Sequence, residues 1–133
     1  MHPLHCDLTR DENAPAAARH ELEAFRDELD PLLYEDLALL TTELVANSVR
    51  HAGPRAGDRV LLDMSLTAGL VRLEVRDGGP GFAFVPREPG DVSPYHWGLQ
   101  IVERIADRWA VVPANGHGST CVWFELDRLA EAG

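Results

Sequence analysis

The sequence predicts one small domain of the α+β class. Three observations predict it: apolar residues recur at helical spacing in several stretches, they alternate with polar residues in others, and turn residues are spread between these stretches without a linker. With 133 residues, 45% of them hydrophobic, the chain is large enough to bury one continuous core and too short for two. We expect residues 1–133 to form a single domain, with its core at about 14–126.

Two helices are predicted in the first half of the chain. From about Pro15, apolar residues recur three or four positions apart as far as Leu29. Asp30 and Pro31 then start a second helix, because aspartate is a favourable N-cap and proline lacks the amide hydrogen that would be unpaired at the first helical position. This helix is predicted to run to about His51, where Ala-Gly-Pro closes it.

The rest of the chain alternates between strands, a loop and one more helix. Two alternating stretches, at 60–67 and 71–76, flank a turn and predict a hairpin. Residues 82–97 are rich in proline and show no period, which predicts a loop. A third helix is predicted to place Leu99, Val102, Ile105 and Trp109 on one face, and two further strands are predicted at 109–113 and 120–126.

Composition excludes several classes of function. The formal net charge is −10 and no basic cluster stands out, so nucleic acid is not an expected partner. All twelve basic residues are arginine, which excludes a phosphate-binding loop that depends on lysine. Cys6 and Cys121 lack metal-type or redox-type spacing. No apolar run approaches a membrane span and no signal-peptide pattern is present, so we expect a soluble, cytoplasmic protein.

A polar column interrupts the apolar face of the second predicted helix. The leucines of that face lead at helical steps to Asn47 and then His51, and Glu43 lies one turn before Asn47. One interpretation is that Asn47 supplies an oxygen ligand to Mg²⁺ while Glu43 orients or deprotonates an attacking hydroxyl. The alternative is that Asn47 caps a neighbouring loop and Glu43 points to solvent. His51 is equally well explained as a packed or helix-terminal histidine.

A second polar residue occupies a strand position at which the alternation calls for an apolar side chain. Asp77 follows the alternation of the second hairpin strand, so its carboxylate is expected on the buried face, where it needs hydrogen-bond donors. An adenine amino group is one suitable donor, and Gly78, Gly79 and Gly81 would let the backbone approach a ring or a phosphate closely. The alternative is a tight glycine turn in which Asp77 accepts hydrogen bonds from nearby amides.

Four segments together resemble the nucleotide-binding motifs of the Bergerat-fold, or histidine-kinase-type, ATPases, and they occur in the right order. They are ELVAN at 43–47, DGGPG at 77–81, GLQIV at 98–102 and GST at 118–120. Within that superfamily, the short length and the segments ELVANSVRHA, GLQIVERIADRW and TCVWFEL resemble the anti-sigma-factor serine kinases and their small regulatory relatives. The resemblance spans about residues 14–126. It implies a two-layer α/β sandwich, in which a mixed, mostly antiparallel sheet is covered on one face by about three helices.

The resemblance also implies roles for single residues. Glu43 matches the general base, Asn47 the Mg²⁺ ligand and Asp77 the acceptor of the adenine amino group. Thr120 matches the threonine that supports adenine recognition beside Asp77. The implied cofactors are ATP and Mg²⁺.

Other matching residues belong to the phosphate end of the implied site. Gly79 and Gly81 match the nucleotide-binding glycines, and Gly98 and Leu99 open the helix whose N-terminus faces the phosphates, where free amides and the helix dipole favour anions. The chain departs from the family pattern at His96, where relatives often carry a glycine.

The resemblance implies an anti-sigma factor with serine/threonine kinase activity. It would transfer the γ-phosphoryl group of ATP to an anti-sigma-factor antagonist and, in another complex, sequester a sigma factor; a homodimer is expected by analogy. A second hypothesis is a non-catalytic switch of the same fold that binds nucleotide or only a protein partner. A third is the catalytic fragment of a histidine kinase, for which His20 would be the phospho-acceptor, although the chain leaves no room for a separate dimerising hairpin.

Overall fold

The computed structural model of the protein describes residues 4–51, 59–77, 97–112 and 121–128. Within these ranges the elements follow one another along the chain as β1 (Leu4–Thr9), α1 (Ala14–Leu22), the 3₁₀ helix η1 (Glu23–Glu28), α2 (Pro31–His51), β2 (Arg59–Leu66), β3 (Leu70–Asp77), α3 (Trp97–Ile105), β4 (Arg108–Val112) and β5 (Cys121–Asp127). None of the helices in the described ranges is long and apolar enough to cross a membrane.

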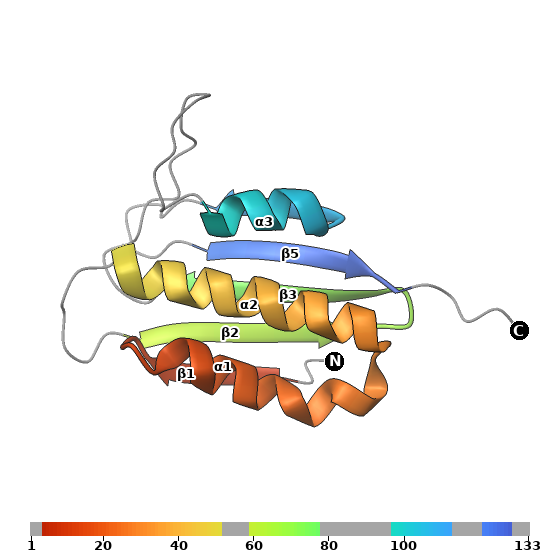
Figure 1. The fold of residues 1–133 in the computed structure, drawn as a ribbon, viewed down its shortest axis with the longest axis horizontal. Helices are drawn as coiled ribbons and strands as arrows, with labels where there is room; N and C mark the ends of the chain where they lie inside the picture. The colour runs from red at the N-terminus through yellow and green to blue at the C-terminus, as the bar shows by residue number, and fades with distance from the viewer. Residues whose placement is uncertain (1–3, 52–58, 78–96, 113–120, 129–133) are drawn as a thin grey trace, which may run out of the picture.

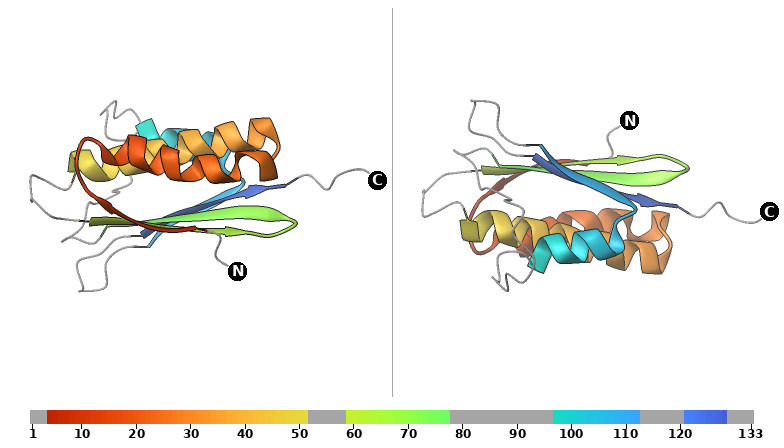
Figure 2. Two further views of the ribbon diagram at one scale, coloured as in Figure 1. Left: turned by 90° about the horizontal axis from the view of Figure 1, so that it is seen from below. Right: turned by 90° about the horizontal axis from the view of Figure 1, so that it is seen from above.

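The strands form one sheet in the order β1-β2-β3-β5-β4. All four pairings between the described strands are antiparallel, where the sequence predicted a mixed, mostly antiparallel sheet. Figures 1 and 2 show α1, α2 and α3 side by side on one face of the sheet, while the described elements leave the other face open. This two-layer α+β sandwich confirms the predicted fold class.

The core lies between α2 and the sheet. Alternation along the strands turns one row of apolar side chains toward the helices, as period-two patterning requires. The helix α1 packs against α2 and β1, and α3 packs against α2 and β4, so α2 is the central helix of its layer. The largest fully buried side chains are Leu22, Leu37, Leu40, Leu44, Val45, Val60, Leu62, Met64, Val71, Leu73 and Phe124.

The start of α2 follows the predicted capping chemistry. The backbone amides of Leu32 and Leu33 donate to Asp30 Oδ2 at 3.1 and 3.4 Å, and the Tyr34 amide donates to the Asp30 carbonyl oxygen at 2.8 Å. Pro31 occupies the first helical position, where it forfeits no hydrogen bond. The aspartate-proline start is therefore confirmed, and it fixes where the buried face of α2 begins.

The structure corrects the sequence prediction at the N-terminus. Sequence analysis assigned no element to the first residues, yet Leu4–Thr9 forms edge strand β1, which pairs with β2. The strand is only six residues long, and outside its hydrogen-bond ladder Arg59 Nε of β2 forms an exposed ion pair with Asp7 Oδ1 at 2.6 Å. Alternating Leu4, Cys6 and Leu8 was the available signal, but it is too short to stand out alone.

Two predicted helices end earlier than expected. The first ends at Leu22 and continues as the tighter 3₁₀ helix η1, which still leaves Leu29 buried.

The third predicted helix ends at Ile105 and does not include Trp109. The reason is that Asp107 is bonded to β5, because its amide donates to the Glu125 carbonyl oxygen at 2.9 Å. Trp109 lies in β4 and still packs against the core, so a strand, rather than the predicted helix, provides this contact.

A charged network crosses the open face of the sheet. Arg108 Nε donates to Glu125 Oε1 at 2.6 Å, and Arg72 Nη1 donates to Glu125 Oε2 at 3.2 Å. The Arg72 guanidinium carbon also lies 4.1 Å from the ring centroid of Trp123, a cation–π contact. The hydrogen bond from Arg108, with a further contribution from Arg72, holds the pKa of Glu125 below its ordinary value of 4.5. The network therefore ties β3, β5 and β4 together.

Replacing Glu125 with glutamine should weaken the dependence of the unfolding free energy on pH in the acid range. A carboxyl group with a lowered folded-state pKa stabilises the fold above its unfolded pKa, and this contribution is lost as the pH falls through the folded value. In urea denaturation, the native chain should lose more unfolding free energy than Glu125→Gln between about pH 5 and about pH 3. The exposed Glu103 of α3, changed to glutamine, is the control. Equal pH dependence of the native chain and Glu125→Gln would contradict this prediction.

Candidate functional site

Four elements converge at one end of the molecule. Figure 1 shows the C-terminal end of α2, the end of β3, the start of α3 and the start of β5 together at the left. The register agrees, because Asp77, the last residue of β3, is opposite Val60 of β2, and its neighbour Arg76 is opposite Cys121, the first residue of β5. The fold thus brings together the chain positions that flank the four motifs.

Asn47 is the best-defined residue of this region. Its side chain on α2 is completely buried, and neither Oδ1 nor Nδ2 has a hydrogen-bond partner among the described residues. A buried polar group without a partner costs about 1–3 kcal/mol, so such groups are rare in folded proteins. The alternative that Asn47 caps a neighbouring loop finds no support in the described contacts. The amide is therefore available to a ligand.

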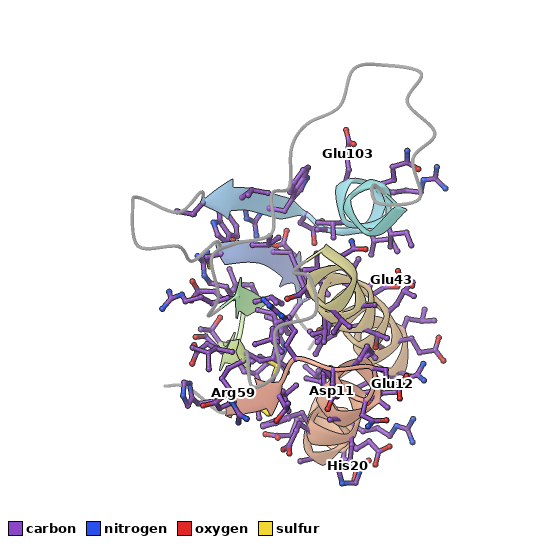
Figure 3. The ribbon with its side chains drawn as sticks, turned by 90° about the vertical axis from the view of Figure 1, so that its left-hand side faces the viewer. Asp11, Glu12, His20, Glu43, Arg59 and Glu103 are labelled. Atoms are coloured by element: carbon purple, nitrogen blue, oxygen red, sulfur yellow. The ribbon has the colours of Figure 1, made fainter. Side chains whose placement is uncertain are left out.

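Glu43 lies four residues before Asn47 and hence about 40° away around the same helix. Its side chain is half-buried, one helical turn before the buried amide. Figure 3 looks onto this end of the molecule and shows Glu43 on α2 in the helix layer. A carboxylate placed in this way can reach a hydroxyl group brought from outside.

The other predicted site residues are only partly described. Asp77 is confirmed as the end of β3, and Gly98 and Leu99 as members of the first turn of α3, but their surroundings lie outside the description. The first turn of a helix carries amides without intrahelical partners, which suits an anion.

Several predicted positions lie outside the described residues altogether. They are Gly78, Gly79, Gly81, His96, Thr120 and the predicted loop up to residue 96, whereas Trp97 already begins α3. The backbone of His51 ends α2, but its side chain is likewise outside the description.

The described residues at this end fit Mg²⁺ held partly by a phosphate ligand. Asn47 offers an unpartnered amide oxygen, and magnesium prefers oxygen ligands, several of which it commonly takes from water and substrate phosphates. No group of three or more His, Cys, Asp or Glu side chains gathers into a metal site among the residues that the structure describes.

Sequence reasoning missed two further buried polar side chains on α2. Thr41 and Ser48 are both fully buried, and their hydroxyl oxygens have no hydrogen-bond partner in the described part of the chain. Both positions fall on the leucine-rich side of the helix, and this signal was present in the sequence.

His20, by contrast, lies away from the polar residues of α2. It is exposed on α1, with Nδ1 3.7 Å from Glu23 Oε2, and Figure 3 shows it at the opposite edge of the helix layer from α3. Nothing in its described surroundings favours the role of a phospho-acceptor.

Comparison with known families gives one finding. The model of the histidine kinase-like ATPase domain matches residues 8–126, which cover most of the chain and include all four motifs. A search of curated proteins returned no match.

Replacing Asn47 with leucine should stabilise the protein in the absence of nucleotide. The substitution removes two buried polar atoms without partners and keeps a similar shape, so the free energy of unfolding should rise by about 1–3 kcal/mol in urea denaturation. Thr42→Val is the matched control, because Thr42 Oγ1 donates to the Ala38 carbonyl oxygen at 2.7 Å and its loss should not stabilise the helix. A lower stability of Asn47→Leu than of the native chain would show that the amide is satisfied within the protein.

Proposed function

We propose, since the chain belongs to the histidine kinase-like ATPase domain family, that it binds ATP with Mg²⁺ where α2, β3, α3 and β5 converge. The observation that carries the proposal is the buried amide of Asn47, whose oxygen and nitrogen lack partners in the described protein. A ligand that supplies a cation and phosphate oxygens would satisfy it.

Each element has a distinct task in this proposal. Asn47 Oδ1 would ligate Mg²⁺, and the amides at Gly98 and Leu99 would donate to phosphate oxygens. Asp77 and Thr120 would receive the adenine, with Gly79 and Gly81 allowing close approach of the backbone. When bound, Mg²⁺ offsets negative charge on the phosphates.

The chemical output that we propose is phosphoryl transfer to a protein serine or threonine. Glu43 would accept the hydroxyl proton while the hydroxyl oxygen bonds to the γ-phosphorus, and the bond between that phosphorus and the bridging oxygen breaks to release ADP. The half-buried position of Glu43, one turn from Asn47, supports this role because a hydroxyl group on another protein can approach it.

The partners follow from the resemblance in sequence. The substrate would be an anti-sigma-factor antagonist, a sigma factor would bind in an alternative complex, and the kinase would act as a homodimer. A non-catalytic switch of the same fold is the second candidate. His96 favours it, since a side chain replaces the glycine often found in the phosphate motif of relatives.

The kinase assignment predicts a specific loss in Glu43→Gln. With labelled ATP, Mg²⁺ and a candidate antagonist, the native chain should transfer phosphate to serine or threonine, and Glu43→Gln should do so about a hundredfold more slowly or worse. The affinity of the variant for ATP should change little, because the substitution keeps size and polarity.

The outcomes of this assay separate the two candidates. Undiminished transfer by Glu43→Gln would refute the role of general base. ATP binding without transfer to any tested antagonist would favour the switch.

A further inference from the structure

Two large apolar side chains are exposed on one side of α2. Leu32 is 72% and Leu39 is 40% exposed, and Val112 of β4 is the only other exposed large apolar side chain among the described residues. The two leucines are seven residues apart, which places them within about 20° of each other around the helix and about 10 Å apart along its axis. Single exposed leucines are normal, whereas an aligned pair suggests a contact surface.

Carboxylates lie on both sides of this row of leucines. Glu35 and Asp36 lie between Leu32 and Leu39 along the helix, within about 60° of both but on opposite sides of them. Glu35 is exposed and Asp36 is half-buried, and within the described chain no ion pair joins either carboxylate to a basic side chain. We call Leu32, Glu35, Asp36 and Leu39 the outer strip of α2.

The outer strip belongs to a strongly acidic part of the molecule. Residues 23–43 include seven acidic side chains and a single basic one, Arg26. On the open face of the sheet, by contrast, opposite charges are paired, as where Arg72 and Arg108 both contact Glu125. The helix layer therefore presents unbalanced negative charge beside an exposed apolar row.

The other sides of α2 are already covered within the fold. The helices α1 and α3 pack beside it, and the sheet lies beneath it (Figures 1 and 2). The outer strip is the side that is left for a contact with another molecule.

Charge decides which class of molecule fits the outer strip. A second copy of the strip would set carboxylates against carboxylates, and nucleic acid or an anionic membrane surface would also be repelled. A basic partner would be attracted. Leucines one heptad apart are covered well by a facing helix, whose own apolar side chains repeat at the same spacing.

We propose that the outer strip of α2 docks a basic amphipathic helix of a partner protein. Apolar side chains of that helix would cover Leu32 and Leu39, while lysine or arginine side chains on its two flanks would pair with Glu35 and Asp36. The inference goes beyond the proposed function and does not depend on nucleotide binding, because no residue of the outer strip belongs to the proposed nucleotide site.

Fluorescence anisotropy with two labelled peptides and the full chain tests this inference. One peptide is a helix of about five turns with a leucine stripe flanked by lysines, and the other has glutamate in place of each lysine. The full chain should bind the lysine peptide and not the glutamate peptide. Binding should weaken as the salt concentration rises, because salt screens exposed charges.

Three sets of substitutions locate the contact. Leu32→Gln with Leu39→Gln should weaken binding of the lysine peptide by about tenfold or more, because two leucines no longer contribute apolar contact. Glu35→Lys with Asp36→Lys should reverse the preference, so that the glutamate peptide binds instead. Val112→Gln is the matched control, since it removes an exposed apolar side chain from the sheet, and it should leave binding unchanged.

Several outcomes would overturn the inference. They are no binding of the lysine peptide by the full chain, equal binding of the two peptides, and unchanged binding after both leucines are replaced. A dimer of the full chain that dissociates in the leucine variant would also overturn it, because the strip would then belong to a second copy. If the leucine variant does not fold in urea denaturation, a charge-reversed variant that still prefers the lysine peptide would overturn it equally. Failure to bind ATP would contradict only the proposed function.

Discussion

The burial of α2 against the sheet is the constraint on which the rest of the structure depends. This helix contacts α1 and α3, and its leucines are buried against the sheet. The same buried face continues past Leu44 into Asn47 and Ser48, where apolar packing gives way to polar atoms that have no partner among the described residues. Packing thus fixes the position of the polar groups, because they belong to a helix that the core holds in place.

This arrangement lowers the stability of the folded protein without a ligand. Each unpartnered polar group costs about 1–3 kcal/mol, a substantial fraction of the stability of a small domain. An apolar residue at Asn47 or Ser48 would remove that cost. Under the proposed function, a bound nucleotide and its metal would supply the missing partner of Asn47, and ligand binding would then stabilise the folded state by mass action.

Much of the fold follows from patterns that extend over many residues. The start of α2 at Asp30, the hairpin of β2 and β3, and the two-layer arrangement were predictable because capping chemistry and hydrophobic periodicity agree there. The strand β1 was not, because six residues give little periodicity, and the end of α3 depends on a tertiary hydrogen bond at Asp107. For the site, sequence periodicity found Asn47 but passed over Ser48, since a small hydroxyl in an apolar row resembles ordinary packing.

The most direct test of the central claim is calorimetric titration of the native chain with ATP, with and without Mg²⁺, beside Asp77→Asn. The account predicts ATP binding that is stronger with Mg²⁺, and a loss of about tenfold or more in Asp77→Asn, because the amide weakens a charge-assisted hydrogen bond to the base. Absence of ATP binding by the native chain under both conditions would contradict the account.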